Sequence, residues 1–411
     1  MNRKPPTITN APGINWTPRK DGQWKALWRA RADLVEKGYK LKSVGIWIGT
    51  PEELDEANIR WIQQRANDLQ NDMLVWGRGG VPSVAGTFDG TLDALAMAYR
   101  MDPDSAYSKK RYVTRKYYDR LLNALTKYHG SERVADIKGR TVLRWHEEWQ
   151  AGGRVAMSHA LVGMLRTIIN FGVTILEDQD CERLALVLSK QRFSMARPRS
   201  EALTADMANA IRTKAHEKER PSIALAQALQ FELMLRQKDV IGEWVPIAEP
   251  GVSDVTNDVG SKWLRGIRWE EIDQNMVLRH VTSKRGKPIE VCLRDAPMVM
   301  DELTKQFPDG LPASGPVIVY EKTGRPWNQT YFRQAWRGLA NDCGIPKSVR
   351  NMDSRAGAIT EATDAGADLE HVRHAATHSD IGMTQRYSRG DAGKTANVMR
   401  LRSEHRNKTR T

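Results

Sequence analysis

The stretch 352–389 constrains this chain more than any other part of the sequence. Arg355 opens a run of small and apolar residues at helical spacing that stops at Gly366, a residue typical of a helix C-cap. A second short helix is predicted before His378, and Tyr387 follows that histidine nine residues later. Arginine, histidine and tyrosine together supply cationic, proton-donating and nucleophilic groups. Such a set suits chemistry on phosphate oxygens, whereas metal-dependent hydrolysis calls for a carboxylate-rich site.

The order of these residues resembles the second catalytic box of the tyrosine recombinases, the phage integrase family. That box reads His-x-x-Arg, a spacer, Leu-Gly-His-Ser and then the nucleophilic tyrosine. Arg355 matches the arginine, His378 and Ser379 match the histidine motif, and Tyr387 matches the nucleophile. One position departs, because Met352 stands where the family has the histidine of His-x-x-Arg. The departure affects proton handling at the site and leaves the nucleophile in place.

An arginine further upstream resembles the family's first box, a Leu-Arg pair with an acid three residues on. The sequence 235–239, LRQKD, supplies Arg236 and Asp239 at that spacing, although the usual preceding Thr-Gly is absent. The residues alone predict an apolar helix over 222–236 that ends at Arg236. Because an unpaired buried charge is costly, we expect Arg236 and Asp239 to form an ion pair there. The resemblance adds a catalytic role for Arg236.

A basic turn is the candidate for a catalytic lysine. Segments 263–273 and 276–293 are predicted to be strands, with residues 284–287 as the turn of a hairpin. The family places a lysine on a hairpin of this kind, and the register assigns that position to Lys284, with Lys287 as the second choice. A turn lysine is otherwise usually solvent-exposed and inert. Arg285 and Lys287 are also candidates for binding DNA.

The resemblance implies a defined chemistry. Tyr387 would attack a DNA phosphate, although a tyrosine with its ordinary pKa of about 10 needs help from its surroundings. Arg236 and Arg355 can donate forked hydrogen bonds to the phosphate oxygens. His378 can donate to the same group or move a proton, and Lys284 is assigned as the acid for the leaving 5′-oxygen. The 3′-phosphotyrosine link conserves the bond energy, so no metal, ATP or other cofactor is implied.

The charge of the chain favours a polyanionic partner. With 63 Lys and Arg against 50 Asp and Glu, the net charge is +13 and the pI is about 9.6. Nucleic acid is the commonest partner of a soluble protein with such a balance, and an acidic membrane surface is the lesser alternative. We expect no membrane partner, because we find no apolar run of the ~18 residues that span a bilayer and no signal-peptide core.

Cysteine and histidine usage argues against a disulfide framework and a metal site. The three cysteines are far apart and form no CxxC pair. His371, His374 and His378 share helical spacing, but no carboxylate or cysteine is placed to complete a ligand set. We therefore expect a cytoplasmic protein of a bacterial host, associated with the nucleoid when it is bound to DNA.

Residues 14–42 combine tryptophans with basic side chains. An Asp-Gly pair predicts a β-hairpin, and a third strand over 43–49 and an amphipathic helix over about 52–75 follow. One interpretation is a DNA-binding module like the arm-binding domain of larger integrases. The other is a small domain with a tryptophan core and a solvated charged face. The candidate DNA contacts are Arg19, Lys20, Lys25 and Arg29.

Residues 90–190 have helical periodicity throughout. A long helix is predicted over 109–128 with a basic cluster at its start, where the helix dipole favours phosphate. Such a cluster is otherwise an ordinary solvated face. The family, however, has a helical core-binding domain at this place that clamps the duplex. The candidate DNA-binding residues of the cluster are Lys109, Lys110, Arg111, Arg115 and Lys116.

The sequence therefore predicts a mainly α fold with small β-sheets, an α+β class, in three domains. An arm-type module with a flexible lead-in is expected over 1–80, and a helical, SAM-like core-binding domain over 87–190. A mixed α/β catalytic domain with a basic C-terminal tail is expected over 200–411. The basic segment 189–201 is predicted to be an interdomain linker.

The first functional hypothesis is a site-specific DNA recombinase that integrates or excises a phage or other mobile element. The implied partners are double-stranded DNA with attachment sites, like subunits in a homotetramer, and host DNA-bending or directionality factors. The second hypothesis is a DNA-binding protein with the same fold but impaired strand transfer, for which Met352 is the argument. A type IB topoisomerase shares the chemistry, but the N-terminal basic module favours a site-specific protein.

Overall fold

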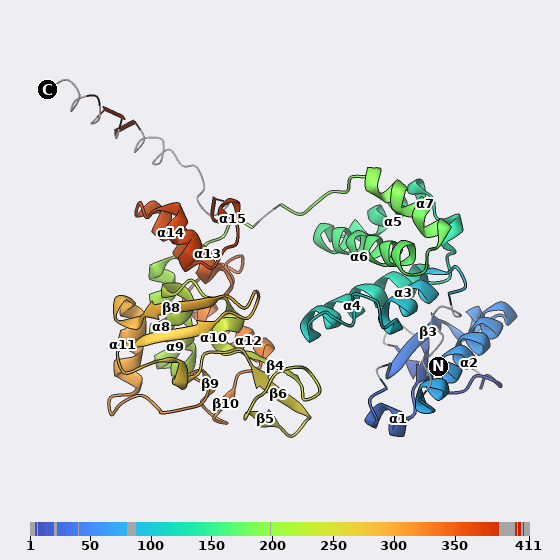
Figure 1. Ribbon diagram of the computed structural model, residues 1–411, viewed down its shortest axis with the longest axis horizontal. Coiled ribbons are helices and arrows are strands. Elements are labelled where there is room, and N and C mark those ends of the chain that lie inside the picture. Colours follow the sequence, from blue (N-terminus) through green and yellow to red (C-terminus); the bar gives the residue numbers. More distant parts are fainter. Residues whose placement is uncertain are drawn as a thin grey trace. The chain divides into compact units, whose positions relative to one another are not determined.

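The computed structural model describes residues 5, 7–19, 23–39, 41–79, 88–197, 199–385, 399–400, 402–403 and 406. Two predicted site residues, Lys20 and Tyr387, lie outside these ranges. The chain forms two compact units, Met1–Pro198 and Arg199–Thr411, each built from helices and small antiparallel sheets (Figure 1). The predicted fold class, mainly helical with small sheets, is confirmed.

The first unit begins with a three-stranded antiparallel sheet that has β2 in its centre. Because side chains alternate along a strand, Trp24, Ala26 and Trp28 of β2 are buried on one face, and Lys25 and Arg29 lie on the other. The predicted hairpin and third strand are therefore confirmed. The elements are β1 (Ile14–Pro18), β2 (Trp24–Arg29), α1 (Ala32–Glu36), β3 (Ser43–Gly49), the 3₁₀ turn η1 (Pro51–Glu53) and α2 (Glu56–Gly77).

Helix α2 packs against α3 (Leu92–Met101) through a buried ion pair. Arg65 is 2% exposed, and its Nε lies 3.2 Å from Oδ2 of Asp93. Its Nη2 contacts Sδ of Met97 at 3.5 Å. Met97 belongs to the same apolar cluster as Trp28 and Leu69. The sheet module and the first helix of the helical domain therefore share one core.

The helical domain contains five helices, in agreement with the helical periodicity of residues 90–190. Its most apolar helix, α6, is long and apolar enough to cross a membrane by length and composition alone, contrary to the sequence expectation. Half of its apolar window is buried inside the protein, and Leu165 and Ile169 are fully buried, as in a core helix. The elements are α3, α4 (Tyr112–His129), η3 (Val134–Asp136), α5 (Gly139–Gln150), α6 (Val155–Thr174) and α7 (Gln179–Lys190).

Helix α9 is the central helix of the second unit. Every residue from Ser222 to Phe231 is buried, and α9 packs against α8, α11 and α13 (Figure 1). Burial on all sides explains why most residues of this segment are apolar. The helices are α8 (Ala205–Glu217), α9 (Pro221–Glu232), α10 (Gln237–Ile241), α11 (Pro297–Gln306), α12 (Gln329–Asp342), α13 (Asp353–Asp364), α14 (Leu369–Ala375) and α15 (Ile381–Gln385).

The strands of the second unit form three small antiparallel sheets, ordered β4-β6-β5, β7-β8 and β10-β9. The predicted hairpin is present as β7 and β8, which pair from Val277 opposite Cys292 to Val281 opposite Pro288. The strands are β4 (Glu243–Pro246), β5 (Thr256–Asn257), β6 (Ser261–Leu264), β7 (Val277–Val281), β8 (Pro288–Cys292), β9 (Val319–Tyr320) and β10 (Arg325–Pro326).

Two predicted elements of this unit are wrong in their extent. The helix predicted over 222–236 ends at Glu232, because Met234 adopts a left-handed backbone with φ of +51° that cannot continue it. The strand predicted over 263–273 is confined to β6. Residues Trp269–Glu271 form a 3₁₀ turn, η4, instead, and Oε2 of Glu271 accepts a hydrogen bond from the Arg268 N–H at 2.9 Å.

Candidate active site

Arg355 joins the two turns that carry the other predicted arginine and the histidine. Its side chain extends from the first turn of α13 and is buried. Nη1 donates to the carbonyl of Met234 at 2.8 Å, and Nη2 donates to the carbonyl of Ala376. Met234 lies two residues before Arg236, and Ala376 lies two residues before His378. One guanidinium therefore fixes the two turns relative to each other.

Arg236 stands at the N-cap of α10 and is connected to the β7–β8 turn through Asp239. The Arg236 N–H donates to Oδ2 of Asp239 at 3.3 Å, and Nη1 lies 3.8 Å from the same oxygen. Asp239 is fully buried, and its Oδ1 accepts from the Ser283 N–H at 2.6 Å. The ion pair expected from the sequence is present, and its carboxylate also holds the hairpin turn.

The three cations of the β7–β8 turn differ in their exposure to solvent. Lys284 and Arg285 are exposed, whereas Lys287 is half-buried and its Nζ donates to the backbone carbonyl of His378 at 3.3 Å. The structure therefore brings the second-choice lysine, Lys287, to the histidine. Lys284, the first choice from the register, lies on the exposed part of the same turn.

His378 is buried beside several cations. Its side chain is 2% exposed, and Nδ1 lies 3.0 Å from Oγ1 of Thr384. Its carbonyl also accepts from Nη1 of Arg373 at 2.8 Å. Burial, followed by the positive charges of Arg355 and Arg236, lowers the pKa of His378 to about 4. The ring is therefore neutral at pH 7, with one nitrogen carrying a proton and the other a lone pair.

Met352 and a second departure from the integrase pattern, which the sequence analysis did not identify, flank these groups. Met352, in place of the first histidine, is 62% exposed at the N-cap of α13. Thr377 takes the place of the glycine before His378, and its φ of +52° lies in the region that suits glycine. Its buried Oγ1 has no hydrogen-bond partner within the described ranges. Tyr387 lies outside those ranges.

The first residue of the second unit is attached to the start of α13. Nη2 of Arg199 lies 2.5 Å from Oδ2 of Asp353 and 2.6 Å from the carbonyl of Ser348. The same carboxylate oxygen accepts from the Arg350 N–H at 2.8 Å. The end of the predicted linker is therefore held against the helix that carries Arg355. Sequence reasoning missed this contact, because partners 154 residues apart leave no periodic signal.

The predicted basic cluster of the first unit lies at the start of α4. The helix begins at Tyr112, so the predicted start at residue 109 is three residues early, and Lys109 and Lys110 lie in the turn before it. Nη1 of Arg115 donates to the Lys110 carbonyl at 2.5 Å and fixes this turn. Lys109, Arg111 and Lys116 are exposed, and Lys110 and Arg115 are half-buried.

The outer face of the sheet carries the other predicted cations. Arg29 is exposed, and Arg19 and Lys25 are half-buried. Burial, followed by the charges of Arg19 and Lys127, lowers the pKa of Lys25. Lys127 belongs to the last turn of α4, so cations of the sheet and of the helical domain gather around Lys25.

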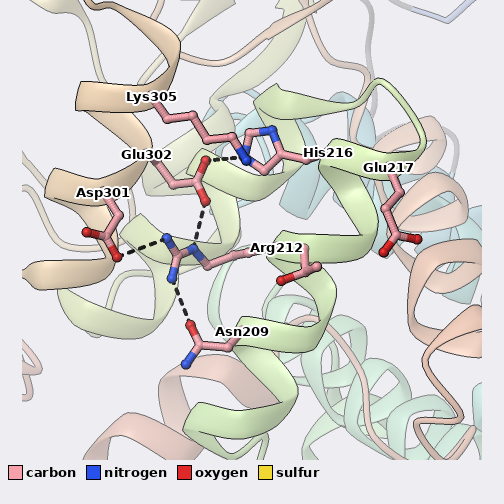
Figure 2. Close-up of a pocket in the computed structure, with 8 residues that line it drawn as sticks. Asn209, Arg212, His216, Glu217, Asp301, Glu302 and Lys305 are labelled. Atoms are coloured by element: carbon pink, nitrogen blue, oxygen red, sulfur yellow. Dashed lines mark hydrogen bonds and ion pairs between the residues drawn. The ribbon is translucent and has the colours of Figure 1, made fainter.

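A pocket of about 490 Å³ between α8 and α11 is separate from these residues. Figure 2 shows Glu302 of α11 reaching between Arg212 and His216 of α8, with distances of 2.8 Å to Nε of Arg212 and 2.7 Å to Nε2 of His216. Arg212 also donates to Asn209 at 2.7 Å. Glu302 therefore neutralises Arg212, and its two contacts tie the two helices together. We therefore assign the pocket a structural role. Over the described ranges, no group of three or more His, Cys, Asp or Glu side chains could hold a metal ion.

The chain resembles known integrases in sequence and in fold. Residues 262–393 match the model of the phage integrase family. No curated protein sequence is similar enough to count as a match. A lambda integrase dimer bound to a COC′ core site has 14% identity and a TM-score of 0.56, covering 94% of this chain and 95% of that one.

Two further structures show the same fold. A lambda integrase tetramer bound to a Holliday junction has 14% identity and a TM-score of 0.55 and covers 93% of this chain and 96% of that one. The Tn1549 transposon integrase (residues 82–397), in complex with circular intermediate DNA, has 12% identity and a TM-score of 0.53. It covers 75% of this chain and 98% of that one. The matched family region contains the β7–β8 hairpin, Arg355 and His378, and over these residues the chain resembles the phage integrase, or tyrosine recombinase, family.

Proposed function

We propose that the protein is a site-specific DNA recombinase that cleaves and rejoins duplex DNA through a 3′-phosphotyrosine intermediate. One observation carries this proposal. Arg355 contacts the turns that present Arg236 and His378, and Lys287 contacts the backbone of that same histidine. Three cations and a neutral imidazole in one place suit a phosphate that gains charge in the transition state.

Each group has a role in the proposed reaction. Arg236 and Arg355 donate to the non-bridging oxygens, where planar guanidinium groups form paired hydrogen bonds. His378 exchanges a hydrogen bond or a proton with the phosphate, because its ring is neutral at pH 7. A lysine of the β7–β8 turn, Lys284 or Lys287, protonates the leaving 5′-oxygen. Tyr387 attacks phosphorus and stores the bond energy for rejoining.

We propose that both units bind double-stranded DNA at attachment sites. In the first unit the exposed cations at the start of α4 and the outer face of the sheet contact phosphates. In the second unit Arg285 and Lys287 contact the duplex next to the cleaved phosphate. We also propose that the protein acts as a homotetramer on two duplexes. Host DNA-bending or directionality factors are further proposed partners, and the proposed location is the bacterial cytoplasm. The element would be a phage genome or another mobile element.

The experiment that tests the function needs a DNA site that the protein selects itself. The Tyr387→Phe variant, which keeps the charge of the chain, is used to select bound duplexes from a random-sequence pool. The selected duplex is then built as a suicide substrate with a nick near the expected cleavage point. We expect the wild type to form a covalent complex that withstands denaturing electrophoresis and Tyr387→Phe to form none. Specific binding by the wild type without a covalent complex would refute strand transfer.

A second function is favoured by one observation. Met352 is exposed where the family pattern has a histidine, which supports a DNA-binding protein with impaired strand transfer. The Met352→His variant separates the two functions. A covalent complex that appears only in that variant favours the binding protein, and equal rates in the two proteins favour the recombinase.

A further inference from the structure

The hydroxyl of Thr384 contacts the ring of His378 in a place without access to water. Oγ1 of Thr384 lies 3.0 Å from Nδ1, and the two residues are 0% and 2% exposed. Because both are buried, water cannot replace this hydrogen bond. Loss of the hydroxyl would leave a ring nitrogen unsatisfied at that position, which is costly in a protein interior.

A hydrogen bond at one ring nitrogen determines what the other nitrogen can do. In a neutral imidazole, a hydrogen bond at Nδ1 fixes the orientation of the ring, and a hydroxyl can make that bond with either tautomer, because it both donates and accepts. His378 is surrounded by cations from several elements, namely Arg355 of α13, Arg236 at the start of α10, Lys287 of the β7–β8 hairpin and Arg373 of α14. With Nδ1 bound to Thr384, Nε2 is the nitrogen through which the ring can act on a phosphate.

The backbone of His378 is held by other contacts. Its N–H donates to the carbonyl of Arg373 at 2.9 Å. Its own carbonyl accepts from Arg373 at 2.8 Å and from Lys287 at 3.3 Å. Removal of the Thr384 hydroxyl would therefore remove this contact of the ring without releasing the main chain. The effect of Thr384 on the ring can be separated from its effect on the fold.

We propose that Thr384 is a positioning residue of the active site, whose hydroxyl holds the His378 ring in one orientation with Nε2 directed to the phosphate. This inference rests on the proposed function, in which His378 acts on that phosphate. Thr384 belongs to α15, the helix that precedes Tyr387 in the sequence. The contact therefore links the position of the ring to the segment that leads to the nucleophile.

The first test observes the ring directly and does not depend on catalysis. The full chain is labelled with ¹⁵N-histidine, and the His378 ring signals are assigned with the His378→Gln variant. We expect the same His378 ring signals in the wild type and in Thr384→Ser, which keeps the hydroxyl, and shifted or broadened ring signals in Thr384→Val. The matched control is Thr167→Val in α6, whose hydroxyl donates to the Gly163 carbonyl at 2.9 Å. That control should leave the His378 signals unchanged.

The second test measures single-turnover cleavage of the selected suicide duplex with protein in excess. We expect Thr384→Val to slow covalent complex formation by roughly 10- to 100-fold at unchanged Kd for DNA, because proton transfer by a positioned side chain contributes about that much or more. Thr384→Ser should recover most of the rate. Unchanged His378 ring signals in Thr384→Val, or a wild-type cleavage rate, would overturn the inference. If the wild type forms no covalent complex, the proposed function fails, and the NMR spectra still decide whether Thr384 holds the ring.

Discussion

His378 shows how burial and neighbouring charge act on one side chain. Cations that suit a phosphate also oppose a proton on the ring, so the site keeps a neutral imidazole among Arg355, Arg236 and Lys287. A charged histidine would have to be compensated by an anion. In the proposed reaction that anion is the DNA phosphate itself.

This state of His378 predicts a pH dependence of stability. Its pKa is about 4 in the folded chain against an ordinary value of 6.5, so between these pH values the unfolded chain binds a proton that the folded chain does not. The free energy of unfolding therefore falls as the pH drops from 6.5 towards 4. Thermal unfolding of the wild type and of His378→Gln measures this. The wild type should lose more stability on acidification than the variant, and equal losses would contradict the lowered pKa.

At the scale of the secondary structure elements, α13 holds the site together. It carries Arg355, its first residue is bonded to Arg199, and its Gly357 lies against the backbone of Leu203. A Cβ on Gly357 would lie 1.8 Å from the Leu203 carbonyl oxygen. The glycine is therefore required by close approach of two backbones rather than by a turn.

This close approach predicts opposite results for two glycine-to-alanine substitutions. Gly357→Ala should lower the free energy of unfolding of the second unit by about 1–3 kcal/mol, because rigid backbone must move to admit the methyl group. Gly163→Ala in α6, where nothing lies within 4 Å, should raise stability by about 0.5–1 kcal/mol through the better helix propensity of alanine. Denaturant titration measures both. A neutral Gly357→Ala would show that α13 is not packed as described.

The sequence predicts most elements because periodicity is a local property. The strands β1 to β3 and the helices α3 to α7 follow from alternation and helical spacing. The contacts of the site do not follow in this way. Arg355 donates to main-chain carbonyls of Met234 and Ala376, which carry no side-chain signal. The choice between Lys284 and Lys287 depends on how the hairpin turns, and sequence register alone favoured the exposed one.

For the whole molecule, the net charge of +13 is the property that bears most on the proposed partner. Some of the 63 lysines and arginines neutralise acids inside the fold, as Arg212 does with Glu302 in the second unit (Figure 2). In the proposal, the exposed lysines Lys109 and Lys116 at the start of α4 contact DNA phosphates. Each of them would displace a counterion from DNA on binding.

We therefore expect the affinity for DNA to depend strongly on salt concentration, and the removal of a single cation to weaken that dependence. Lys109→Gln and Lys116→Gln should each lower the slope of log K against log salt by about 1, with no change in the selected DNA sequence. Lys305→Gln, an exposed lysine at the α8–α11 pocket, is the matched control and should leave the slope unchanged. Fluorescence anisotropy over a salt series makes the measurement. Equal slopes in all four proteins would exclude α4 as a DNA-binding surface.

The most direct test of the recombinase assignment is the chemical identity of the covalent link. The wild type is incubated with the suicide duplex, digested with trypsin and nuclease, and analysed by tandem mass spectrometry. The account predicts a nucleotide attached through a 3′-phosphate to Tyr387, in the tryptic peptide 387–389. A nucleotide on another residue, or no modified peptide from a protein that binds the duplex specifically, would contradict it.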